Sequence, residues 1–100
     1  MNITFTGHGV EVTQALKTFT EEKLNKLERH FNHIISINIV FRVEKLRQMV
    51  EATILVYKFE IHASAESEIM YTAIDNLIDK LNTQLIKHKE KIQDHRDNRN

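Results

Sequence analysis

The sequence has no cysteine, no proline and no tryptophan, and only two of its 100 residues are glycine. Without cysteine, disulfides, thiolate metal sites and thiol nucleophiles are excluded, and a reducing compartment is permitted. The lack of proline and the scarcity of glycine argue against internal linkers. We see neither a signal peptide nor a stretch of about 20 apolar residues that could span a membrane. We therefore expect one cytoplasmic domain over residues 1–92, followed by a polar, disordered tail over 93–100.

Neither sign of charge is in excess, because 14 lysines and arginines balance 14 aspartates and glutamates. A nucleic-acid-binding chain normally has a visible surplus of basic residues. The balance hides a small asymmetry, since residues 87–100 hold five bases and three acids. Composition alone therefore does not identify a partner.

Hydrophobic periodicity predicts six elements in the order β-α-β-β-β-α. Alternating residues indicate four strands and helical spacing indicates two helices, in chain order 2–6, 14–31, 35–43, 50–57, 59–65 and 68–92. The first helix connects two parallel strands, and the last three strands form an antiparallel meander. Both helices are apolar along one side, so both should cover the same face of a four-stranded mixed sheet. The predicted fold class is an α+β two-layer sandwich.

Catalysis and metal binding find little support in the residues. His30 and His33 are three residues apart, but the first helix should end between them, and no known ligand spacing occurs. His62 alternates onto the open face of the sheet, where an exposed histidine is ordinary. No phosphate loop or nucleophile motif is present. We expect neither an enzyme nor a cofactor, metal or small-molecule substrate.

Lysines lie beside the apolar stripe of both predicted helices. On a helical wheel, Lys80, Lys87 and Lys91 fall within about 40° of one another. In the first helix, Lys23 falls within the apolar sector and Lys26 beside it, so their stems should extend to the edge of the core. If the helices lie side by side, such lysines can converge on the groove between them and contact RNA phosphates. The alternative is that they only cover apolar surface and aid solubility.

One further set of residues carries a family resemblance. It runs through Glu60–Glu66, Met70-Tyr71, Ala73–Asp75, Leu77–Leu81, Gln84-Leu85 and Lys87–Lys89, with Asn2–Thr4, Gly7, Val10–Thr13, Leu16, Lys23, Lys26–Glu28, Phe31 and Val43–Lys45 in the first half. In these positions the chain strongly resembles the short-form ribosome hibernation promoting factors. The match covers about residues 2–91 in one register.

The resemblance implies a fold similar to a double-stranded-RNA-binding domain, and a bacterial protein that is monomeric when free. It implies binding to the small ribosomal subunit in the decoding channel, where messenger and transfer RNAs sit, and inhibition of translation. Short-form members also favour the pairing of inactive ribosomes, together with a separate modulation factor. The positions that match the family's RNA contacts are Lys23, Lys26, Lys80, Lys87, Lys89 and Lys91, with Lys45 and Arg42 as further candidates.

Departures from the family leave alternatives open. Tyr57-Lys58-Phe59 stands where relatives often have a glycine-rich turn, and His8-Gly9 replaces a polar pair. The short tail favours ribosome pairing over the blocking of pairing, which is the action of a related translation inhibitor with a longer tail. A protein-interaction module is the other alternative, acting through Val40, Leu55 and Tyr57 on the open sheet face.

Overall fold

The computed structural model describes residues 2–97 except 30 and 32, with side chains described up to residue 88. Its elements are β1 (Asn2–His8), α1 (Gln14–Glu28), β2 (Ile34–Glu44), β3 (Arg47–Val56), β4 (Phe59–Ser67) and α2 (Met70–Asp97). The strands form one sheet in the order β1-β2-β3-β4. β1 is parallel to β2, and the other two pairs are antiparallel. The predicted element order and mixed sheet are confirmed.

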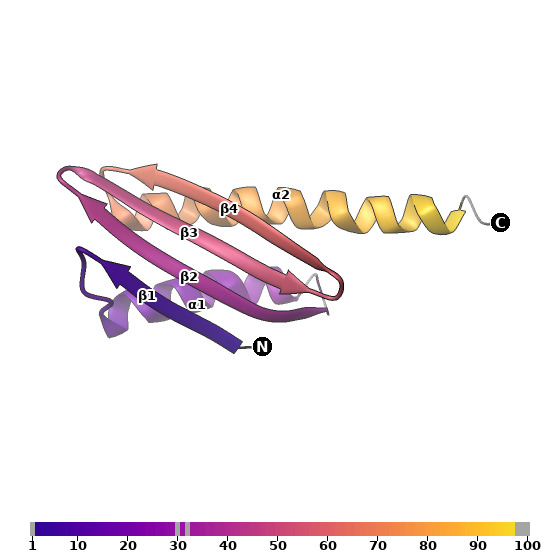
Figure 1. The fold of residues 1–100 in the computed structure, drawn as a ribbon, viewed down its shortest axis with the longest axis horizontal. Helices are drawn as coiled ribbons and strands as arrows, with labels where there is room; N and C mark the ends of the chain where they lie inside the picture. The colour runs from indigo at the N-terminus through magenta and orange to yellow at the C-terminus, as the bar shows by residue number, and fades with distance from the viewer. Residues whose placement is uncertain (1, 30, 32, 98–100) are drawn as a thin grey trace.

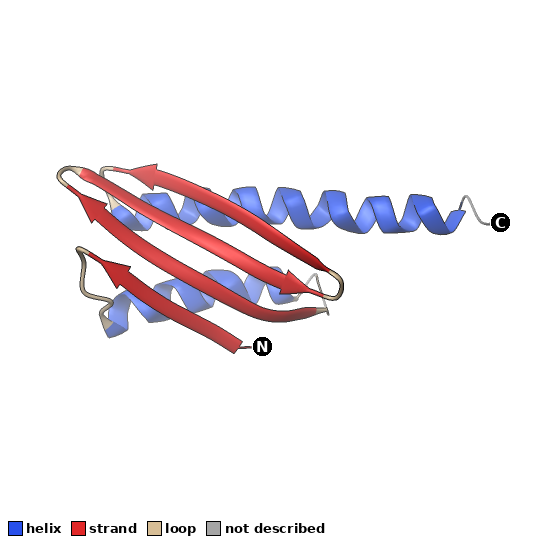
Figure 2. Ribbon diagram, in the orientation of Figure 1, coloured by secondary structure: helices blue, strands red, loops and turns tan. Residues whose placement is uncertain are grey.

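Both helices cover one face of the sheet, and the other face is open (Figures 1 and 2). Inward-facing residues of the strands and the apolar stripes of the helices form a single buried cluster. Phe41 and Ile54 from the sheet and Leu24, Leu77 and Leu81 from the helices are fully buried. Because side chains alternate along a strand, the neighbours of these sheet residues point to the open face. The two-layer sandwich is therefore confirmed.

α1 begins at the residue that the sequence predicts. Thr13 has extended backbone angles, and its hydroxyl accepts a hydrogen bond from the Leu16 amide at 3.2 Å, as an N-cap does. Inside the helix, the hydroxyl of buried Thr20 donates to the Leu16 carbonyl at 2.8 Å, which satisfies its polar atom. α1 ends at Glu28, earlier than the predicted residue 31, yet Phe31 still packs against the core from the connection.

Both glycines lie where β1 ends, Gly7 within the strand and Gly9 directly after it in the connection to α1. Gly9 has a φ of +71°, and a Cβ there would be 2.6 Å from the Val43 carbonyl oxygen. At Gly7, a Cβ would be 2.4 Å from the Val10 carbonyl oxygen. The chain therefore uses its two glycines where a close turn joins β1 to the rest of the fold.

α2 is longer than the sequence predicts. The Ser67 hydroxyl accepts a hydrogen bond from the Ile69 amide at 3.3 Å just before the helix, and the Ala73 amide donates to the Ile69 carbonyl at its start. The helix continues to Asp97, past the predicted end at residue 92, because no proline or glycine interrupts the segment. Its C-terminal part projects beyond the sheet (Figure 1). Residues 98–100 lie outside the described residues, so the disordered tail remains a prediction there.

Two-residue turns without glycine connect the antiparallel strands. Glu44 pairs with Arg47 across the first turn, and Val56 pairs with Phe59 across the second. Each turn places a lysine at positive φ, 55° for Lys45 and 70° for Lys58. Since this region is unfavourable for residues with a Cβ, both turns carry backbone strain.

Candidate nucleic-acid interface

α1 presents one cationic flank to α2. The Lys23 ammonium lies 3.3 Å from the Asp75 carboxylate and 5.3 Å from the centre of the Phe19 ring. Phe19 in turn meets Tyr71 of α2 edge to face, with ring centres 4.7 Å apart. These contacts fix which side of α1 faces α2. Lys26, one turn further along, is exposed beside this contact.

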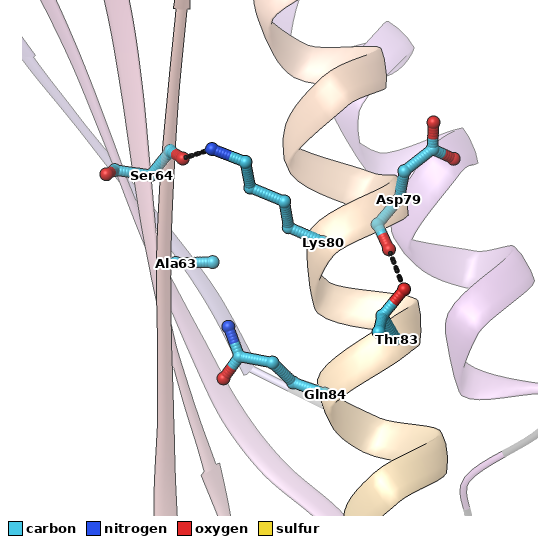
Figure 3. Close-up of a pocket in the computed structure, with 6 residues that line it drawn as sticks. All are labelled: Ala63, Ser64, Asp79, Lys80, Thr83 and Gln84. Carbon is cyan, nitrogen blue, oxygen red and sulfur yellow. Dashed lines mark hydrogen bonds between the residues drawn. The ribbon is translucent and has the colours of Figure 1, made fainter.

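α2 turns a different flank toward the free edge of β4. The Lys80 ammonium donates to the Ser64 carbonyl at 2.7 Å, and the Gln84 amide donates to the His62 carbonyl at 3.0 Å. Figure 3 shows both side chains reaching from the helix to the strand, while the Asp79 carboxylate points away from β4. β4 is the last strand of the sheet, so these carbonyls would otherwise lack a strand partner.

The expectation that lysines of both helices converge on the groove between them is therefore wrong for Lys80. The apolar stripe of α2 faces the sheet. Asp75 lies on the flank of α2 that faces α1, and Lys80 lies on the opposite flank, over β4. Lys87 is exposed and follows Lys80 by seven residues, about two turns, so it continues the β4-side flank. The structure thus separates the lysines into an α1 flank (Lys23, Lys26) and a β4-side flank (Lys80, Lys87).

The four other candidates are not part of these two flanks. Lys89 and Lys91 lie outside the residues whose side chains are described. Arg42 lies on the open face of the sheet, away from the helices, because it is the neighbour of buried Phe41 in β2 and side chains alternate along a strand. Lys45 is exposed in the β2–β3 turn. A contact through Arg42 would therefore require a different face from the one that Lys26 and Lys87 use.

A paired arginine stands next to this turn. Arg47 donates two hydrogen bonds to the carboxylate of Glu66, at 2.7 Å and 3.1 Å. The hydrogen bond from Arg47, with its charge, lowers the pKa of Glu66 below the ordinary value of 4.5, and the same hydrogen bond raises the pKa of Arg47. Since its guanidinium is held in this two-pronged geometry, Arg47 is less available to an external anion than Lys45.

The sequence missed two residues that shape the interface. Asp75 pairs with Lys23, and Gln84 occupies the His62 carbonyl. Both positions flank the apolar stripe of α2 on the wheel, and which neighbour each one meets depends on the packing of α1 and β4. Among the side chains that the structure describes, no cluster of three or more histidine, aspartate or glutamate residues could hold a metal. No helix among the described residues is long and apolar enough to cross a membrane.

Comparison with known proteins identifies the family to which the chain belongs. Residues 3–93 match the family described as "Sigma 54 modulation protein / S30EA ribosomal protein". The chain belongs to this family. A member named "Ribosome hibernation promoting factor" from Azotobacter vinelandii is 53% identical over 91 residues, which cover 91% of this chain and 85% of that one. The same name is carried by an Escherichia coli strain K12 protein, 48% identical over 95 residues that cover 95% of this chain and 100% of that one.

Two solved structures share the fold. A ribosomal subunit interface protein from Coxiella burnetii superposes with a TM-score of 0.86 at 40% identity, over 90% of this chain and 99% of that one. The N-terminal domain of Thermus thermophilus Protein Y gives 0.82 at 26% identity, over 88% and 99% of the two chains. The family resemblance read from the sequence is thereby confirmed.

Proposed function

We propose that this family member is a hibernation factor that binds the small ribosomal subunit over the RNA of the decoding channel. There it excludes messenger and transfer RNA, inhibits translation and favours the pairing of inactive ribosomes, acting with a separate modulation factor. The observation that carries the proposal is the identity of about half to relatives named for ribosome hibernation, sustained over nearly the whole chain. Such a role places the protein in the cytoplasm, as a binding protein and not an enzyme.

The surface chemistry supports contact with RNA phosphates. Lys26 and Lys87 are exposed, and neither has an ion pair or side-chain hydrogen bond among the described side chains. Lys23 and Lys80 have partners, but both lie at the surface. A phosphate can replace the Ser64 carbonyl as the partner of Lys80, or bind the Lys23 ammonium together with the Asp75 carboxylate. Each phosphate that these lysines neutralise releases counterions, so affinity should decrease steeply with salt.

Sedimentation with purified ribosomes tests the proposal. The protein should migrate with small subunits, and adding it with a modulation factor should increase the ribosome-dimer peak. Lys26→Gln and Lys87→Gln should each weaken binding and reduce the slope of log affinity against log salt by about 0.9 for one lost phosphate contact. Lys17→Gln is the matched control, because Lys17 lies on the side of α1 away from Lys23.

The outcomes separate the alternatives. Co-migration without a dimer peak, or with a smaller one, would identify a translation inhibitor that blocks pairing. Binding that is insensitive to salt and to both lysine variants would contradict the phosphate mechanism. If the double variant Val40→Ser, Leu55→Ser abolished function with ribosome binding intact, the open sheet face would be the working surface instead.

A further inference from the structure

The turn between β3 and β4 carries two exposed aromatic rings. Tyr57 is 68% exposed and Phe59 is 51% exposed, although aromatic side chains favour burial. Tyr57 and Lys58 form the turn itself, and Phe59 is the first residue of β4. We call Tyr57, Lys58 and Phe59 the aromatic turn. Large exposed apolar groups of this kind commonly mark a binding surface.

The backbone of the aromatic turn is not the one that stability alone would select. Lys58 has a φ of 70°, a conformation that glycine adopts without strain and lysine does not. Its ammonium lies 5.3 Å from the centre of the Tyr57 ring, so the strained residue brings a cation to an aromatic face. The β2–β3 turn has a positive φ at Lys45 as well, so this feature belongs to the two-residue turns, and the cation beside an exposed ring is what distinguishes the aromatic turn.

The aromatic turn is also joined to α2. The rings of Phe59 and His88 meet edge to face with centres 4.3 Å apart. His88 lies about 100° around α2 from Lys87, toward the sheet, so this contact fixes the turn against the sheet-facing side of the helix. In Figure 1 the β3–β4 turn lies at the end of the sheet beyond which the C-terminal part of α2 projects. The turn therefore has two aromatic groups: Phe59 is held against His88 of α2, and Tyr57 is exposed with the Lys58 ammonium beside its ring.

We propose that the aromatic turn is a stacking site for an unpaired nucleobase of RNA on the Tyr57 ring, with Lys58 binding the adjoining phosphate. This inference rests on the proposed function and names which part of the RNA this end of the molecule contacts. Bases in a duplex are already stacked on one another, whereas bases in loops and bulges can stack on aromatic side chains. The combination of exposed rings with cations at their margin is the arrangement that single-stranded RNA sites use. A cation beside the exposed ring favours an RNA strand, which carries phosphates, over an apolar protein surface.

The test compares Tyr57→Leu with Tyr57→Phe on isolated small ribosomal subunits. Leucine keeps an apolar side chain but removes the stacking ring, so affinity should decrease about tenfold, which corresponds to about 1.4 kcal/mol. Phenylalanine keeps the ring, so affinity should stay within about twofold of wild type. The salt slope should not change for either variant, because stacking releases no counterions. For Lys58→Gly, the slope should decrease by about 0.7, the value for one single-strand phosphate.

Dimethyl sulfate probing of the subunit RNA identifies what the ring contacts. Wild type should protect one or two unpaired bases that become reactive again with Tyr57→Leu, while the rest of the protected region stays unchanged. Equal affinity and equal protection for wild type and Tyr57→Leu would overturn the inference and leave the proposed function standing. Weaker binding with unchanged base protection would overturn it in favour of a ribosomal protein. No binding by wild type would remove the proposed function and the inference together.

Melting curves control for folding. Tyr57 is exposed, so Tyr57→Leu should melt within about 3 °C of wild type. Lys58→Gly should melt higher, because glycine relieves the positive φ. A loss of binding by a variant that folds at least as stably as wild type then reports on the contact alone.

Discussion

Lys23 and Asp75 connect the two helices through an ion pair of 3.3 Å. Lys23 is also a candidate for binding RNA phosphate, so an internal carboxylate competes with the RNA for one ammonium group. The side chains are 31% and 52% exposed, which means that water screens the pair and a phosphate can reach it. Asp75 therefore sets how much of the Lys23 charge is available on the α1 flank.

Replacing Asp75 by Asn should tighten binding to small subunits while slightly weakening the fold. Removal of the competing carboxylate should raise affinity about two- to fivefold, and loss of a surface ion pair should lower the free energy of unfolding by at most about 1 kcal/mol. Binding titrations and thermal melts measure the two effects. Asp79→Asn removes the same charge from the same helix without touching Lys23, so an equal gain there would show that net charge alone is responsible.

Lys80 and Lys87 should separate stability from binding, although they lie on one flank of α2. Lys80→Met removes the hydrogen bond to the Ser64 carbonyl and should lower the free energy of unfolding by about 1 kcal/mol. Lys87→Met keeps the apolar stem and should leave the melt unchanged. Both should weaken binding to small subunits to a similar extent. An unchanged melt for Lys80→Met would mean that the bond to β4 contributes nothing to stability.

Lys45→Gly should stabilise the fold. Lys45 has a φ of 55°, and relief of that strain should add about 1 kcal/mol to the free energy of unfolding, or about 4–8 °C in melting temperature. Leu46→Gly is the matched control, since Leu46 is 84% exposed in the same turn but is not at positive φ. It should not stabilise the protein, because glycine there only adds flexibility to the unfolded chain.

Glu66→Gln should destabilise the protein at neutral pH but not in acid. The hydrogen bonds from Arg47 lower the pKa of Glu66 in the folded protein. Ionisation of Glu66 is therefore more favourable in the folded protein than in the unfolded chain. That contribution is present above the ordinary glutamate value of 4.5 and is lost as the pH decreases through the lower, folded value. The difference in melting temperature between wild type and Glu66→Gln should therefore shrink below pH 4.5. A difference that stays constant with pH would contradict this assignment.

Periodicity was sufficient for the architecture because the buried face of each element repeats regularly. Alternation in β2 and the stripe of α2 identify the residues that the structure buries, such as Phe41 and Leu77. The ends of the elements were less predictable, because they depend on local stops. α1 ends early although Phe31 stays packed, and α2 continues because nothing in residues 93–97 breaks a helix.

The candidate site was predictable residue by residue but not in its arrangement. A helical wheel shows that Lys80 borders the apolar stripe of α2. The wheel alone does not show which border faces α1 and which faces β4. Strand order decides the matter, since α2 lies over β3 and β4 with α1 on one side and a free sheet edge on the other. Which lysines face each other is thus a property of tertiary packing.

The reach of Lys80 and Gln84 to β4 has a consequence for the behaviour of the concentrated protein. An unprotected outer strand invites further chains to add to it, which is how filaments and precipitates grow. With the carbonyls of His62 and Ser64 already occupied, this strand offers an incoming chain few acceptors. Lys80 and Gln84, which shape this flank of α2, therefore also reduce the tendency of the protein to polymerise through β4.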